Sequence, residues 1–350
     1  MRIEKYNGDN YPALAAAARK VHVASLLHRD FVDYYYLGQP WSELYLALDE
    51  EGNCTAFIGY DRMRFEHDGQ ELPIGFATNF YTLQPGTGGF LWLQWMKTCG
   101  AGIVFGGSED THHILKKQKF TYYPGMNVYT LNARYTVYPS DPPWRRVIKR
   151  VLQSVTRKPL PAYETAAFLR ESASIKVTEM PSSSAKRIEA SCFPFRFAPT
   201  EEYMRWRYNS TLAFVRYCWF DIFADGQRVG YCVLNDAPGQ LIVAHSDGVD
   251  AEKLAYGILK AVFAAAGNSD RNRSALLVSS HPAMQSIFAR SGFFLDSNRP
   301  VAIGTLRSTL DLPDPSRWLF NFGMGDNDLR PSTFHTPATD HTPATESDNR

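Results

Sequence analysis

The sequence predicts an α/β protein made of two similar units, each with a mixed, mainly antiparallel sheet flanked by helices. Two observations predict this class: one order of elements occurs twice along the chain, and an amphipathic helix separates the two copies. The chain has 350 residues, which is enough for two medium domains. With 44% hydrophobic and 21% charged residues, it can bury substantial cores.

The first copy of the repeated order begins with β-rich runs at residues 43–83, which Glu-Gly and Asp-Gly turn signals separate into a meander. A glycine-rich loop at 84–89 and an almost wholly apolar helix at 90–98 follow. A short apolar strand at 103–107 and a helical pattern that ends at Phe120 complete the copy.

The second copy repeats this order after residue 212. Another meander, with Asp225-Gly226 at a turn, leads into an apolar-striped helix at 251–266. A strand at 274–280 and a helix at 281–293 follow. Gly59-Tyr60 aligns with Gly230-Tyr231, and an aromatic residue closes both copies at nearly the same distance. We interpret the pattern as a duplication.

These patterns set the expected boundaries. We expect a first domain over 1–140, a linking helix over 141–162 and a second domain over 163–328. The segment 331–350 is poor in large apolar residues, so it cannot bury enough area to offset chain entropy, and we expect it to be disordered.

The linking segment carries a single apolar stripe at helical spacing, with prolines at both ends. Arginine and lysine side chains lie mostly off that stripe. We favour a connecting helix that packs on a neighbouring domain and exposes its basic face. The alternative is a peripheral helix, 143–156, that lies on an acidic membrane surface or partner.

Composition excludes several classes of protein. The formal net charge of +1 gives no overall attraction to nucleic acid, and we expect none as a partner. Five cysteines without a C-x-x-C pair predict a reducing, cytoplasmic setting without disulfides or a metal site. We expect no signal peptide and no transmembrane helix, because no sufficiently long apolar run occurs.

The glycine-rich loop is the strongest functional signal. Gly86, Gly88 and Gly89 allow backbone to approach a ligand closely, and the helix that follows offers unpaired N–H groups. Together they predict an anion site that suits a pyrophosphate. The alternative is a tight turn without a ligand.

The order of strand, glycine-rich loop, helix, strand and closing helix resembles the GNAT (Gcn5-related N-acetyltransferase) superfamily, and in particular its tandem, two-domain members. The resemblance covers residues 1–325 and implies acetyl-CoA or another acyl-CoA as co-substrate. It also implies that the cofactor's pyrophosphate lies against the loop residues Leu83, Gln84, Gly86, Thr87, Gly88 and Gly89.

The sequence departs from the family pattern at several places. Thr87 stands where a middle glycine is usual, and Leu115 and Phe288 stand where many members have a tyrosine acid. In the second copy Asp247, Asp250 and Glu252 lie where the phosphates would sit, and they would repel them. We therefore assign CoA to the first copy and regard the second as degenerate.

The resemblance implies attack of an amine on an acyl thioester, which needs a general base. Glu109 and Asp110 follow the strand of the first copy and are the candidate bases, although Asp110 could equally be a helix N-cap. His112 and His113 are weaker candidates. Tyr122 could supply the missing phenolic acid.

Arg205, Arg207 and His245 are the candidate acceptor-binding residues. Arginines beside aromatics suit an acidic acceptor, but they could equally pair with acidic neighbours while the aromatics anchor a helix. His245 alternates with apolar neighbours, which favours a core or interface position, and the alternative is a base that faces a pocket between the domains. The expected acceptor is an amine of a small molecule, aminosugar or peptide. The alternative is a binding protein that has lost CoA, or a transferase that takes acyl groups from aminoacyl-tRNA. The sequence does not predict an oligomeric state.

Overall fold

The computed structural model describes residues 1–107, 109–137, 141–267, 273–305, 310–325, 327–329 and 334. The predicted disordered tail therefore lies outside the described residues, except for Phe334. The ring of Phe334 is buried and stacks on His28 at a centroid distance of 4.3 Å. Within the described part of the chain, no helix is long and apolar enough to cross a membrane.

The first half of the chain opens with a short strand and two helices, and continues with a meander. Its elements are β1 (Arg2–Lys5), α1 (Tyr11–Lys20), η1 (Ala24–Leu27), α2 (Arg29–Tyr36), β2 (Ser42–Leu48), β3 (Cys54–His67), β4 (Gln70–Thr82), α3 (Thr87–Thr98), β5 (Ala101–Phe105), α4 (Glu109–Lys117) and β6 (Thr121–Leu131).

The second half follows the linking helix and repeats the order. Its elements are α5 (Pro143–Thr156), η2 (Leu160–Tyr163), α6 (Ala166–Glu171), β7 (Ile175–Met180), η3 (Ser182–Ser184), β8 (Phe195–Phe197), α7 (Glu201–Arg207), β9 (Tyr217–Ala224), β10 (Gln227–Ala237), β11 (Gln240–Gly248), α8 (Ala251–Ala266), β12 (Ser274–Ser279), α9 (Pro282–Arg290), β13 (Phe294–Thr305), η4 (Pro315–Arg317) and β14 (Trp318–Leu319).

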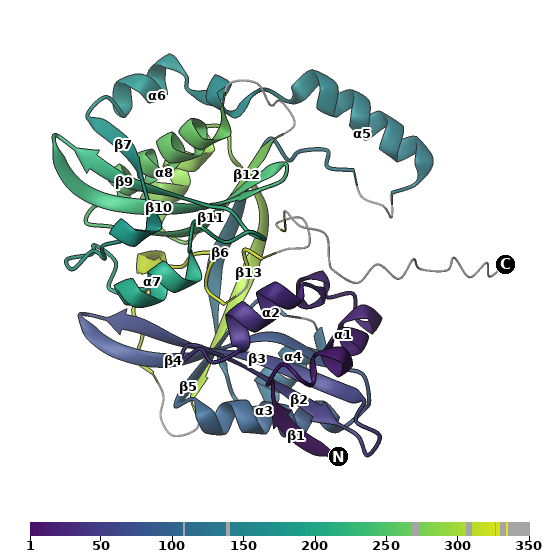
Figure 1. The fold of residues 1–350 in the computed structure, drawn as a ribbon. Coiled ribbons are helices and arrows are strands. Elements are labelled where there is room, and N and C mark those ends of the chain that lie inside the picture. The colour runs from purple at the N-terminus through teal and green to yellow at the C-terminus, as the bar shows by residue number, and fades with distance from the viewer. Residues whose placement is uncertain are drawn as a thin grey trace.

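The strands of both halves form one continuous, mixed sheet, which Figure 1 shows running through the whole molecule. The order is β1-β2-β3-β4-β5-β13-β6-β12-β11-β10-β9-β7. Each repeat contributes its last strand to the other half, because β13 pairs with β5 and β6 pairs with β12. The predicted α/β class and the duplicated order of elements are confirmed, and the exchanged strands join the two copies.

Helices cover the sheet on both faces, and three apolar clusters hold the layers together. Trp92, Trp95 and Leu115 of α3 and α4 pack on the first half of the sheet, and α8 and α9 pack on the second half. The largest cluster lies between the halves, where α1, α2 and α7 meet the C-terminal segment. Burial of these apolar surfaces is the main stabilising contribution.

The environment of the linking helix α5 differs from the one that the sequence predicts. No residue of α5 is buried, and its apolar stripe faces outward. The favoured expectation of a stripe packed on a neighbouring domain is therefore wrong. The polar side of the helix faces the chain instead, since Lys149 Nζ donates to the carbonyl of Thr136 at 3.0 Å and Gln153 Nε2 donates to that of Tyr135 at 2.7 Å.

A buried ion pair ties the C-terminal segment to the second half. Arg207 of α7 pairs with Asp328, and both side chains are almost completely inaccessible. The Arg207 guanidinium also donates to Tyr217 Oη at 2.6 Å and to the carbonyl of Gly325 at 2.9 Å. Tyr217 Oη donates to Asp328 at 2.9 Å, so both charges lie within one hydrogen-bonded network.

This network predicts a contrast between two arginines of one helix. Arg207→Met leaves the Asp328 carboxylate buried without its partner, so we expect a loss of about 3–5 kcal/mol in the free energy of unfolding. Arg205→Gln removes an exposed pair with Glu201, at 3.0 Å, and should change it by less than about 0.5 kcal/mol. Urea unfolding measures both variants, and equal losses would contradict the assignment.

Candidate functional site

The candidate site lies where two parallel strands separate. β4 and β5 are paired only at Gly75–Gly102 and Phe76–Ile103, although both strands continue beyond these residues. The backbone edge of β4 from Ala77 onward therefore faces an opening instead of a neighbouring strand. Such an opening at the carboxyl ends of parallel strands is a common position for ligands.

A bulge in β4 lies beside this opening. Phe57 pairs with Tyr81 and Gly59 pairs with Thr78, so two residues of β4 stand opposite one residue of β3. Asn79 takes a left-handed backbone conformation there, with φ +47°, which is uncommon for a residue other than glycine. Its Nδ2 donates to Tyr36 Oη at 3.2 Å, which holds the bulge against α2.

The glycines that follow β4 have different physical roles. Gly86 is the N-cap of α3 and has φ +86°, a left-handed conformation that would be strained for a residue with a side chain. A Cβ on Gly88 would lie 2.2 Å from Thr82 Oγ1, so this glycine lets α3 approach β4. A Cβ on Gly89 would meet nothing within 4 Å. The helix begins at Thr87 and not at Phe90 as predicted, so two glycines belong to its first turn.

The N-terminus of α3 carries no side-chain cap, because its N-cap residue is Gly86. The first N–H groups of a helix have no partner within it, and they concentrate the positive end of the helix dipole. The Thr87 hydroxyl does not cap them, since it donates to the carbonyl of Gln84 at 2.8 Å. This end of α3 therefore remains available to an anion.

Two of the predicted loop contacts are already occupied within the chain. The amides of Leu83 and Gln84 both donate to the carbonyl of Thr55, at 2.8 and 3.3 Å. Those amides continue the pairing of β4 with β3. The available donors of the predicted loop thus lie at its helical end, around Gly88 and Gly89.

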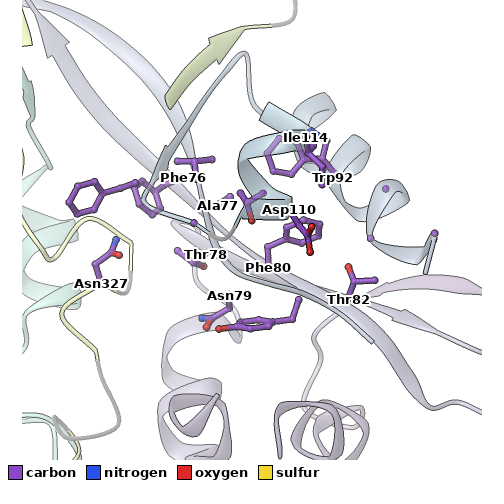
Figure 2. A pocket seen from close by; sticks show the side chains of 18 residues that line it. Phe76, Ala77, Thr78, Asn79, Phe80, Thr82, Trp92, Asp110, Ile114 and Asn327 are labelled. Carbon is purple, nitrogen blue, oxygen red and sulfur yellow. The ribbon is translucent and has the colours of Figure 1, made fainter. Parts of the chain in front are cut away.

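A cleft of about 720 Å³ fills the opening between β4 and β5. Figure 2 shows side chains that reach it from β4, from α3 and α4, and from the C-terminal segment through Asn327. Gly86, Gly88 and Gly89 of the predicted loop lie along it. The walls are largely apolar and aromatic, as in most small-molecule sites; they include Phe76, Ala77, Phe80, Trp92, Val104, Phe105 and Ile114.

Of the predicted catalytic residues Glu109, Asp110 and Tyr122, only Asp110 lines the cleft among the described residues. Asp110 lines it and is the single carboxylate among its described lining residues, whereas the exposed Glu109 does not line it. Because α4 begins at Glu109, Asp110 lies inside the first turn and not at the N-cap. Tyr122 lies outside the cleft and shares a hydrogen bond of 3.0 Å with His112 Nδ1; burial raises the pKa of Tyr122. His113 is exposed.

The predicted acceptor residues do not reach the cleft. Arg205 is exposed and paired with Glu201, and Arg207 is buried in the ion pair described above. His245 is fully buried in β11, where Nε2 lies 2.8 Å from Tyr231 Oη and the ring stacks on Tyr208. The structure gives Arg207 and His245 positions in the core between the halves.

The second repeat has a corresponding opening between β11 and β12, but the helix end beside it is capped. β11 and β12 also separate after three pairs, the last being Ile242–Leu276. The Asp250 carboxylate caps α8, because it accepts from the amides of Glu252 and Lys253 at 3.0 and 2.9 Å. The helix end that an anion would need is thus already occupied.

The chain itself fills the rest of the second opening. Beyond the last β12 pair, Gly323 N donates to the carbonyl of Ala244 at 2.6 Å, and Asn321 Nδ2 donates to that of Ser246 at 3.2 Å. Asp247 pairs with the buried Arg196 and accepts from Ser191 Oγ at 2.6 Å. Burial nevertheless raises the pKa of Asp247 to about 6.

Sequence reasoning missed three polar groups of the cleft. Thr78 Oγ1 and Trp92 Nε1 are buried there and have no hydrogen-bond partner in the described structure. Thr78 lies in the predicted meander at 43–83 and Trp92 in the predicted apolar helix at 90–98, and neither pattern indicates a polar group that faces a cleft. Asn327 comes from a segment that only long-range packing places beside β4, so no local pattern could indicate it.

In the part of the chain that the structure describes, no group of three His, Cys, Asp or Glu side chains is arranged to hold a metal ion. The uncapped end of α3, the apolar walls and Asp110 define the candidate site.

Comparison with known proteins gives structural neighbours only. No protein-family model and no curated protein matches this chain. A GCN5-related N-acetyltransferase from Anabaena variabilis is 10% identical, with a TM-score of 0.50 over 86% of this chain and 72% of that one. Another from Kribbella flavida is 13% identical, with a TM-score of 0.50 over 87% and 71%.

These neighbours show that the chain has the GNAT fold, as predicted. The two copies of meander, helix, strand and helix give that fold its tandem arrangement here. At 10–13% identity, this likeness establishes the architecture, whereas chemistry depends on the residues of the site.

The burial of His245 should make the free energy of unfolding depend on pH in the acidic range. Burial, followed by the charges of Arg196 and Arg207, lowers the pKa of His245 from its usual 6.5 to about 3. A lowered folded pKa means that the unfolded chain binds the proton first, so stability is lost as pH falls below 6.5.

Comparing the wild type with His245→Gln by urea unfolding isolates this contribution. As the pH falls from 7 to 5, the wild type should lose about 2 kcal/mol of unfolding free energy relative to His245→Gln. A difference that does not change with pH would show that His245 is not held neutral.

Proposed function

We propose that this protein is an acyl-CoA-dependent N-acyltransferase whose single cofactor site lies in the first half of the chain. The observation that carries the proposal is the uncapped N-terminus of α3, which lies at the opening between β4 and β5. The matching helix α8 has its N-terminus capped by Asp250 and its opening filled by residues 321–323. The GNAT fold of the neighbours supports an acyltransferase in general terms.

The pyrophosphate of CoA would lie at the amides around Gly88 and Gly89, where a helix end stabilises negative charge. The acyl arm would then follow the separated edge of β4 toward the bulge at Asn79. Apolar walls exclude water from that part of the cleft and strengthen hydrogen bonds to a polarised carbonyl. Backbone N–H groups at the bulge are the proposed donors.

Asp110 is the proposed general base. It lines the cleft from α4, across from β4, and can accept a proton from an acceptor ammonium either directly or through a water molecule. The acceptor is proposed to be an amine of a small molecule, an aminosugar or a peptide. Thr78 Oγ1 and Trp92 Nε1 are unpaired groups in the same cleft that could orient it.

Calorimetric titration with acetyl-CoA tests the cofactor site, with one site per chain expected. Gly89→Asp places a carboxylate in the anion site without steric conflict, because nothing lies within 4 Å of the new Cβ. It copies the electrostatics of Asp250 in the second half. We expect the affinity to fall roughly ten-fold or more, while helix stability is retained or increased.

Gly89→Asn is the matched control, since it has almost the same shape without the charge and should bind acetyl-CoA far better than Gly89→Asp. Equal affinities for the wild type and Gly89→Asp would remove α3 from the cofactor site. Two sites per chain would contradict the asymmetry between the halves.

Adjacent carboxylates on α4 test the proposed base. Asp110→Asn should lower the rate of thiol release from acetyl-CoA, with amine acceptors found by screening, by roughly 10²–10⁴-fold. Calorimetric affinity for acetyl-CoA should stay within a few-fold. Glu109→Gln, one residue away and outside the cleft, should leave the rate close to that of the wild type. The reverse pattern would assign the base to Glu109.

A further inference from the structure

Among the described helices, α5 exposes the most large apolar side chains. Val147, Val151 and Val155 are exposed by 59%, 58% and 79%, and Trp144 and Ile148 by 60% and 50%. These side chains fall at helical spacing on one face. Contiguous exposed apolar surface of this kind marks an interaction site.

The orientation of α5 is fixed by its polar side. Lys149 Nζ donates to Asp141 Oδ2 at 2.6 Å and to the carbonyl of Thr136, and Gln153 donates to that of Tyr135. Arg146 Nε donates to the carbonyl of Asp141 at 2.6 Å. The helix therefore turns its hydrogen-bonding face to the chain and its apolar face to solvent, which is the reverse of an ordinary surface helix.

Positive charge borders the apolar face on both edges. By helical geometry, Arg145 lies next to one edge and Arg150 next to the other, and both are exposed. The residues 143–156 include no aspartate or glutamate. Figure 1 shows α5 at the periphery, away from the sheet and its covering helices. A flat anionic surface with an apolar interior complements these features.

We propose that α5 docks the protein on a membrane that contains anionic lipids, with Trp144, Ile148 and the valine stripe inserted below the headgroups. Tryptophan is favoured at the depth of the headgroups, and arginines at the edges pair with lipid phosphates. An amphipathic helix of this kind lies in the interface plane, and electrostatic attraction adds to the buried apolar area. This inference does not depend on the proposed acyltransferase activity.

Sedimentation of the full chain with vesicles tests the proposal. The vesicles are phosphatidylcholine alone, or phosphatidylcholine with about one third phosphatidylserine. We expect the protein to sediment with the anionic vesicles and not with the neutral ones. Binding should weaken at high salt, because exposed charges are then screened.

Two exposed aliphatic residues provide a matched pair of variants. Ile148→Glu on α5 should lower partition into anionic vesicles by roughly ten-fold or more, because it places a carboxylate in the inserted face. Leu169→Glu on α6 changes a side chain of the same exposure, 50%, outside that face and should bind as the wild type does. Arg145→Gln combined with Arg150→Gln should weaken binding by about thirty-fold.

Three outcomes would overturn the proposal. They are absence of wild-type binding to anionic vesicles, equal binding to neutral vesicles, and equal loss of binding in Ile148→Glu and Leu169→Glu. Analytical ultracentrifugation provides a further check. Self-association of the wild type that Ile148→Glu abolishes would show that a second copy of the chain covers α5 instead.

Discussion

The separation of β4 from β5 is the constraint on which the rest of the site depends. Two residue pairs join these parallel strands, and the bulge at Asn79 turns β4 away from the regular ladder. The opening that results would expose unpaired backbone in an ordinary sheet. Here it is bordered by the end of α3, by Asp110 and by the C-terminal segment, so polar groups and apolar walls converge on one cleft.

The duplication supplies an internal comparison. Both repeats place a helix after a strand that separates from its neighbour, but α8 is capped by Asp250 and α3 is uncapped. The C-terminal segment has opposite effects in the two halves, because Gly323 closes the second opening while Asn327 forms a wall of the first. The exchange of β6 and β13 brings the halves together and places that segment between them. The proposal of one cofactor site per chain rests on this arrangement.

The fold could be predicted from sequence because local patterns specify it: meanders with Gly turns, an apolar helix, and a repeat of the whole order. Asp110 and the loop glycines were predicted because they are adjacent to those elements. Residue type alone left Arg207 and His245 between a binding role and a structural role. Long-range pairs with Asp328 and Tyr231 bury both in the core, which agrees with the structural role. For α5 the sequence favoured a packed stripe and left the exposed one as the alternative, because periodicity shows that a face exists and not what covers it.

Amide hydrogen exchange with and without acetyl-CoA tests whether α3 holds the cofactor, because it locates the bound anion without a mutation. Bound acetyl-CoA should slow the exchange of the amides of Gly88, Gly89 and their neighbours at the start of α3. Exchange should not change at the start of α8, where Asp250 already accepts from the amides. Protection at α8, or unchanged exchange at both helix ends under saturating acetyl-CoA, would contradict the placement of the cofactor at α3.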